Sequence, residues 1–158
     1  MIVLSGCGSG GHKAATEDVQ EILGTGFTFS APSSWKVQRS GATLAAASGP
    51  VDLVSVTTFP LARRYEPKLW DKVVPALDRA AGQLAAQLHG RLSSRGTIVV
   101  AGRRARRYDI GYRRAGRQLV ERAVFVLEGR HEHELLCRFE AGGDDSACAT
   151  LVRTFEPA

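Results

Sequence analysis

The residues best suited to contact a ligand or partner are seven arginines between positions 103 and 117. Tyr108 and Tyr112 are interleaved with them, and Asp109 is the one acid in the stretch. Guanidinium groups recognise phosphate and carboxylate groups, and they also stack on phenol rings. The alternative is that these arginines are solvated and blunt an edge hairpin. We expect an anionic partner to contact Arg103, Arg104, Arg106, Arg107, Arg113, Arg114 and Arg117.

A second cluster, His131–Glu134, has the residue types of a metal site. On a strand the two imidazoles would point to one side and the two carboxylates to the other. Two imidazoles can share a zinc ion, but a zinc site needs a third and a fourth ligand. Asp109 and His89 are candidates, and no spacing compels either. We therefore predict a polar strand start with no metal and no cofactor.

Motifs of nucleophilic and acid–base catalysis are absent from the sequence. It contains no Gly-x-Ser-x-Gly, its serines and histidines have no recognisable spacing, and its carboxylates form no obvious pair. We therefore expect a protein that is not an enzyme.

The first of three cysteines, Cys7, ends the sequence Leu4-Ser5-Gly6-Cys7, which resembles a bacterial lipobox. A lipobox is the site where a secretory signal is cut so that the cysteine can be lipidated. The six residues before Cys7 are too few for the basic and apolar regions of a signal peptide. We therefore interpret residues 1–6 as the remnant of a lipoprotein signal peptide, residues 7–24 as a flexible tether and residues 25–158 as the domain.

The other two cysteines, Cys137 and Cys148, are eleven positions apart, on an expected strand and an expected helix. Docking of that helix on the strand can bring the two Cα atoms within the about 4.4–6.8 Å that a disulfide requires. One lipidated cysteine and one disulfide would suit an exported protein, where disulfides persist. The alternative is three free thiols in a cytosolic protein.

The charge of the chain favours anionic partners. Its 158 residues carry a formal net charge of +5, and 17 of the 21 basic residues are arginine. Lipid head groups, wall polymers and nucleic acid are all anionic, and export argues against nucleic acid. No apolar run approaches the roughly 18 residues of a membrane-spanning helix, so we expect attachment through a lipid on Cys7.

The hydrophobic pattern predicts a meander of strands, a long helix, more strands and a short helix. Residues 16–23 suggest one or two helical turns. Pro75 predicts a kink or break in the long helix, and the apolar run Ala123–Leu127 predicts a central strand covered on both faces. We expect strands at 27–30, 35–37, 43–47, 51–59, 97–101, 103–112, 118–127 and 131–140, and helices at 67–89 and 146–155.

This order predicts an α+β fold with a single antiparallel sheet and helices on both faces. The pattern Phe27-x-Phe29-x-Ala31-Pro32-x-x-Trp35 resembles the opening of PsbP-like domains. That α/β/α sandwich is shared by photosystem accessory subunits, a Ran-binding import factor and actinobacterial lipoproteins of the LpqN kind. The resemblance runs from about Gly26 to Pro157 and implies accessory and interaction roles. It includes the strand start at 102–105, the turn at 129–130 and the pair Cys137/Cys148.

Together these patterns predict a lipid-anchored binding or accessory protein on the outer face of the cell membrane. Its expected partner is an envelope protein or an anionic envelope polymer or lipid. The alternative is a small carrier that holds an apolar or anionic ligand between sheet and helix near Trp70 and Pro75. A cavity of several hundred cubic ångströms there would favour the carrier, and a filled core would exclude it. A third hypothesis is a metal-dependent enzyme at His131 and His133.

Overall fold

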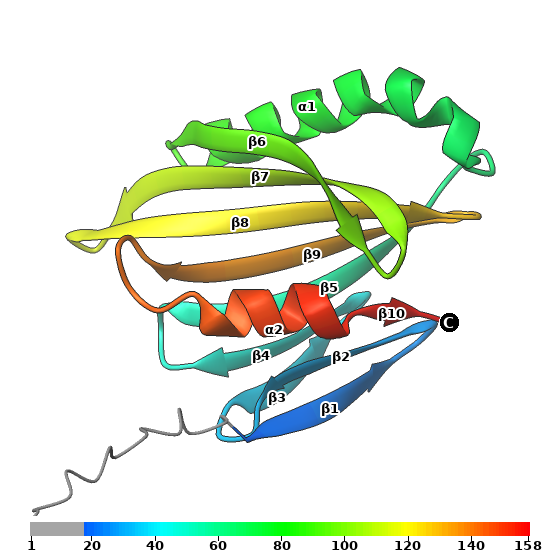
Figure 1. Cartoon of the computed structure of the whole chain (residues 1–158). Coiled ribbons are helices and arrows are strands. Elements are labelled where there is room, and N and C mark those ends of the chain that lie inside the picture. Colours follow the sequence, from blue (N-terminus) through cyan, green and yellow to red (C-terminus); the bar gives the residue numbers. More distant parts are fainter. Residues whose placement is uncertain (1–17) are drawn as a thin grey trace, which may run out of the picture.

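The computed structural model describes residues 18–158, and residues 1–17, including the expected anchor Cys7, lie outside the described part. The described chain forms two antiparallel β-sheets, of three and seven strands, with two α-helices (Figure 1). The expectation of one sheet with helices on both faces, as in an α/β/α sandwich, is therefore wrong. The structure is mostly β. On one face of the larger sheet, where the sequence predicted only a helix, the smaller sheet packs together with a helix.

In each sheet the strands have a defined order from one edge to the other. The smaller sheet has the order β1 (Val19–Gly24), β2 (Phe27–Pro32) and β10 (Glu156–Pro157). The first half of the larger sheet has the order β3 (Lys36–Ser40), β4 (Thr43–Ser48), β5 (Asp52–Pro60) and β9 (His131–Glu140). It continues with β8 (Arg117–Glu128), β7 (Arg103–Arg114) and β6 (Arg91–Val100).

Residues 19–24 form strand β1, whereas the sequence suggested a tether with one or two helical turns here. Residues 19–24 pair with β2 in register, with Val19 opposite Pro32 and Gly24 opposite Phe27. Of the strand only Ile22 is buried, because its side chain joins the core. Residues 19–24, which the sequence assigned to the tether, therefore form part of a sheet.

Strand β8 is the central strand that the apolar run Ala123–Leu127 predicted. It lies between β9 and β7, and every residue of the run is at most 4% exposed. Val124 and Val126 face one side of the sheet, whereas Phe125 and Leu127 face the other. Because both faces of β8 are covered, the run can be apolar on both sides without exposing hydrophobic surface.

One face of the larger sheet is covered by the smaller sheet and by α2 (Ser146–Thr154). The core on this side contains Phe29 of β2, Leu151 of α2 and Phe155, all 0–1% exposed. Figure 1 shows α2 beside β2 and β9. The smaller sheet thus supplies apolar side chains that a nine-residue helix is too short to provide.

The opposite face carries α1 (Trp70–Gln87), which follows a 3-10 turn at Pro67–Leu69 and packs on β6 and β7. Its inner residues, Leu77 and Ala81, contact a separate apolar cluster that includes Tyr108 and Phe125. The helix continues past Pro75 without a break. Of the kink or break that Pro75 predicted, the break into two helices is therefore wrong. A proline here removes one backbone bond of the first turns, and packing of the apolar stripe outweighs that loss.

Candidate functional site: a groove beside helix α1

A cavity of about 410 Å³ opens between the first half of α1, the loop after β5 and strands β8 and β9. We call it the apolar chamber. Its apolar walls are Leu61, Ala62, Leu69, Val73, Ala76, Leu77 and Leu127. Its polar groups are Arg63, Arg64, Tyr65 and Glu132. A mostly apolar pocket with a few polar groups is the usual form of a small-molecule site.

A second cavity, of about 390 Å³, is lined on one side by guanidinium groups, and we call it the arginine chamber. Arg64, Arg103 and Arg104 line it together with Glu128. Arg64, Tyr65 and Leu127 line both chambers, so the two adjoin. Together they form what we call the α1 groove.

The loop between β5 and α1 is held in place by backbone hydrogen bonds. Leu61 N–H donates to the Arg130 carbonyl at 2.8 Å, and Tyr65 N–H donates to the Gly129 carbonyl at 2.7 Å. Pro67 then begins the 3-10 turn that leads into α1, where a proline fits because its missing N–H has no partner to lose. These contacts fix the loop that carries Arg63 and Arg64 against the β8–β9 turn.

Two arginines of β7 enter the groove in defined positions. The Arg104 guanidinium lies 5.4 Å from the centre of the Trp70 ring and donates to the Pro67 carbonyl at 3.0 Å. Arg103 donates to the Ala101 carbonyl at 2.7 Å and forms an ion pair with Glu128. Stacking on an indole orients a guanidinium while leaving several of its five N–H donors free.

Burial changes the acidity of two groups in the groove. Burial raises the pKa of the Tyr65 phenol, while the charge of Arg104 acts in the opposite direction. Burial also raises the pKa of the Glu132 carboxyl. Both side chains therefore favour their neutral forms more than they would in water.

The seven arginines predicted to bind an anionic partner do not form one surface. Arg106 pairs with Asp78 at 3.2 Å, and Arg117 lies 3.9 Å from Glu140. Arg107 pairs with an acid of its own strand, as described below. Arg114 stacks on the Tyr112 ring. Only Arg103 and Arg104 line the groove, and Arg113 lies at the far end of β7. Binding of an anionic partner by all seven stays a prediction.

The sequence reasoning missed Arg63 and Arg64, which bring positive charge to the groove from a different part of the chain. A signal was available, because the pair lies between Pro60, which ends β5, and Pro67, which starts the next helical turn. Two adjacent arginines in a short loop between such boundaries are exposed by necessity. The proximity of Arg64 to Arg104 could not be read from the sequence, because it depends on the bonds that hold this loop against the β8–β9 turn and on the pairing of β8 with β7.

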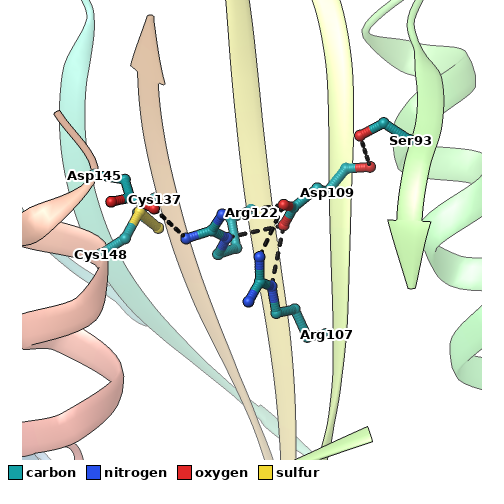
Figure 2. Close-up of polar contacts among 7 residues, drawn as sticks. All are labelled: Ser93, Arg107, Asp109, Arg122, Cys137, Asp145 and Cys148. Carbon is teal, nitrogen blue, oxygen red and sulfur yellow. Dashed lines mark hydrogen bonds and ion pairs between the residues drawn. A yellow bond between two sulfur atoms is a disulfide. The ribbon is translucent and has the colours of Figure 1, made fainter. Parts of the chain in front are cut away.

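Asp109, a candidate metal ligand, lies in a different network on the α2 side of the sheet (Figure 2). It accepts hydrogen bonds from Arg122 Nε at 2.9 Å and from Arg107 Nη2 at 3.0 Å. Arg122 also pairs with Asp145 at 3.0 Å, beside the disulfide. Burial acts to raise the pKa of the Asp109 carboxyl, but the two guanidinium groups hold it below its usual value. Asp109 therefore serves a structural ion-pair network.

The histidines of β9 lie in structural surroundings. His133 is 3% exposed, its Nδ1 is 2.9 Å from Thr58 Oγ1, and its ring lies 5.3 Å from the Phe155 ring. His131 is exposed at the strand start. Within residues 18–158, no group of three or more His, Cys, Asp or Glu side chains could hold a metal ion. The third hypothesis, a metal-dependent enzyme, gains no support here.

His133 should make the protein less stable in mild acid. Burial, and then the charge of His131, lower the pKa of its imidazole. The unfolded chain therefore binds the proton more readily, and stability should fall as the pH drops below about 6.5, the ordinary histidine pKa. We expect urea unfolding at several pH values to show this slope, and His133→Gln to reduce it. The control His131→Gln should keep most of the slope, because burial is the larger cause of the lowered pKa. An unchanged slope in His133→Gln would contradict this assignment.

The structure joins Cys137 of β9 and Cys148 of α2 in a disulfide, with a Cα–Cα distance of 5.6 Å. Both residues are 2% exposed. The disulfide therefore ties the N-terminal part of α2 to β9, the last strand of the larger sheet in the sequence. The spacing of the two cysteines had suggested such a bridge.

Among the residues that the structure describes, no helix is long and apolar enough to cross a membrane.

Comparisons with known proteins add a fold relationship. No protein-family model matches the chain, and no curated protein matches it, so the PsbP-like resemblance stays a prediction. A crystal structure from Bacteroides thetaiotaomicron VPI-5482 is similar, with a TM-score of 0.63, 12% sequence identity and coverage of 84% of this chain. At this identity the likeness concerns the fold alone, and this chain spans 45% of the length of that one.

Two further solved structures are similar to a lower degree. LpqN, involved in cell envelope biogenesis of Mycobacterium tuberculosis, has a TM-score of 0.49 at 12% identity, over 88% of this chain and 92% of its own. A protein of unknown function from Pseudomonas aeruginosa, PA94, has a TM-score of 0.40 at 21% identity, over 78% and 84%. The comparisons therefore relate this chain to other proteins through its fold and leave its function to its own residues.

Proposed function

We propose that this protein is an extracytoplasmic binding protein of the bacterial cell envelope, anchored to the membrane by a lipid on Cys7. In this proposal it carries out no reaction, and it holds an apolar or anionic ligand in the α1 groove. The observation that carries the proposal is the apolar chamber of about 410 Å³ beside the first half of α1. If side chains had filled this space, the structure would have excluded a carrier.

Two features support the extracytoplasmic part of the proposal. The disulfide Cys137–Cys148 is of the kind that persists in oxidising compartments. The sequence Leu4–Cys7 resembles a lipobox, and Cys7 would then be available for acylation because the other two cysteines are paired with each other.

In this proposal two candidate metal ligands have structural roles instead. His133 is hydrogen-bonded to Thr58 within the core, and Asp109 is held by Arg107 and Arg122. These contacts give both side chains a structural role. A groove with apolar walls and a charged end is suited to holding a ligand.

The anchor is tested in a bacterial host by placing the basic and apolar regions of a lipoprotein signal peptide directly before Leu4-Ser5-Gly6-Cys7 of this chain. We expect the protein in the membrane fraction, with an intact mass that begins at Cys7 and includes acyl chains. A Cys7→Ser variant should move to the soluble extracytoplasmic fraction, whereas Cys148→Ser should stay with the membrane. An unacylated wild-type protein in the cytosol would contradict the proposed location.

The groove is tested with an uncharged apolar fluorescent probe, N-phenyl-1-naphthylamine, added to the full-length Cys7→Ser protein. We expect saturable binding that Ala76→Trp abolishes, because the indole would fill the apolar chamber. The matched control is Ala86→Trp, at another exposed position of the same helix that does not line the chamber. No saturable binding, or equal binding by both variants, would contradict the proposed site.

A further inference from the structure

We infer that the α1 groove takes a single-chain amphiphile with an anionic head group. The chain would lie in the apolar chamber and the head group in the arginine chamber. This inference rests on the proposed function, because it names the class of ligand that the same groove would hold.

The larger excess of positive charge in the groove lies in the arginine chamber. Besides Arg64, which both chambers share, the apolar chamber has the ionisable groups Arg63 and Glu132. In the arginine chamber, three guanidinium groups face the single carboxylate of Glu128, which is already paired with Arg103. Neither Arg64 nor Arg104 has an ion pair with a carboxylate among residues 18–158. An anion would therefore be attracted to this end of the groove.

Arg104 is positioned before any ligand arrives. Its stacking on Trp70 and its bond to the Pro67 carbonyl restrict its conformers while the side chain stays accessible to solvent. A group that is already ordered loses less entropy when it binds. A guanidinium also presents donors in a planar fork that matches the oxygens of phosphate, sulfate and carboxylate groups.

The two chambers are arranged so that one ligand can occupy both. Arg64, Tyr65 and Leu127 belong to both walls. An apolar chain is favoured in the chamber walled by Val73, Leu77 and neighbouring apolar side chains, because it leaves water there. The same ligand can then place its charged end between Arg64 and Arg104.

The size of the apolar chamber favours one chain over two. Its volume of about 410 Å³ is near the lower end of the roughly 300–1,000 Å³ of small-molecule pockets. The polar end is a chamber of similar size, about 390 Å³, which leaves room for a head group larger than a bare carboxylate.

The test is calorimetry on the full-length Cys7→Ser protein with its disulfide intact and with each amphiphile below its micelle concentration. The probes are monododecyl phosphate, dodecanoate, dodecyl maltoside and inorganic phosphate. We expect the two anionic amphiphiles to bind at least about tenfold more tightly than the maltoside, a difference of about 1.4 kcal/mol. The order of the phosphate and the carboxylate will identify the preferred head group. Inorganic phosphate alone should bind far more weakly than the dodecyl ester.

Paired variants locate the effect. Arg64→Gln with Arg104→Gln should remove most of the advantage of the anionic amphiphiles, measured for each variant as the ratio of their affinities to the affinity of the maltoside. The matched control, Arg113→Gln with Arg114→Gln, removes the same charge at the other end of β7, about 30 Å away by strand rise, and should keep the advantage. Equal binding of dodecyl phosphate and maltoside would overturn the inference, as would equal binding of phosphate with and without its chain.

These outcomes also separate the inference from the proposed function. If the uncharged fluorescent probe binds and Ala76→Trp blocks it, the groove is a binding site, and lack of preference for anions overturns only the ligand class. If no probe binds, including the uncharged one, both the proposed function and the inference fail.

Discussion

Replacing Arg138 by Met should destabilise the protein by about 3–5 kcal/mol, the usual cost of leaving one member of a buried ion pair alone. The Glu121 side chain is 5% exposed and accepts hydrogen bonds from Arg138 Nε at 3.0 Å and from the Tyr112 hydroxyl at 2.7 Å. Without Arg138, the Glu121 carboxylate keeps the hydrogen bond from the Tyr112 hydroxyl, but this neutral donor does not balance its negative charge. Urea unfolding at neutral pH measures the loss, with an unchanged slope against urea as the check for two-state behaviour.

Two comparisons isolate the stranded carboxylate as the cause. The double variant Glu121→Gln with Arg138→Met should recover most of the stability, because the buried charge is then absent. Arg114→Met removes an arginine that stacks on the same tyrosine from the exposed strand end and should cost less than about 1 kcal/mol. A loss below about 1 kcal/mol for Arg138→Met would mean that water reaches Glu121 readily.

Removing the disulfide should cost about 3 kcal/mol. The bridge closes a loop of eleven residues, and restricting such a loop in the unfolded chain stabilises the native state by roughly this amount. The double variant Cys137→Ala with Cys148→Ala should therefore unfold at lower urea. It should still fold, because Leu151 and Phe155 keep α2 and the segment after it in the core.

Reductant provides the internal control for this prediction. The wild-type protein should lose stability when the disulfide is reduced, whereas the double variant should unfold at the same urea concentration with and without reductant. Because both cysteines are buried, reduction requires equilibration through the unfolded state. A wild-type transition that does not move after complete reduction would contradict the predicted contribution.

The sequence predicted elements with strong periodicity more accurately than it predicted their partners. Strand β9 has the bounds 131–140 that the pattern indicated, and α2 ends one residue before the predicted end. The central position of β8 could be predicted because a run that is apolar on both sides must be covered twice. These elements owe their positions to burial, and burial leaves a pattern in the sequence.

Edge strands leave little pattern, and here the prediction was wrong or incomplete. Residues 91–96 of β6 are polar or exposed on both sides, so only the apolar end of this strand was predicted. Strand β1 buries a single side chain. Alternation in Phe27–Ser30 indicated a strand but not its sheet, and the chain in fact leaves the smaller sheet at Pro32 to start the larger one at Lys36.

The groove shows the same limit for function. The sequence placed a possible ligand between sheet and helix near Trp70, and the apolar chamber lies along Leu69–Leu77. It did not combine Arg104 with Arg64, which are forty positions apart and line one chamber because the loop of Arg64 is bonded to the β8–β9 turn beside β7. Charge density along the chain drew attention to Arg103–Arg117, whereas pairing with acids in three dimensions neutralises several of these arginines.

The strand order also determines how quickly this fold can be reached. Strand β5 pairs with β9, with Thr58 opposite His133, and β2 pairs with β10, with Thr28 opposite Glu156. Neither sheet can be completed until the last part of the chain is present, and loops of many residues must close before those pairings stabilise anything. We expect folding in milliseconds to seconds, typical of β proteins with distant contacts. During that interval the chain exposes unpaired strands, so a chain crossing a membrane before folding would depend on protection from aggregation.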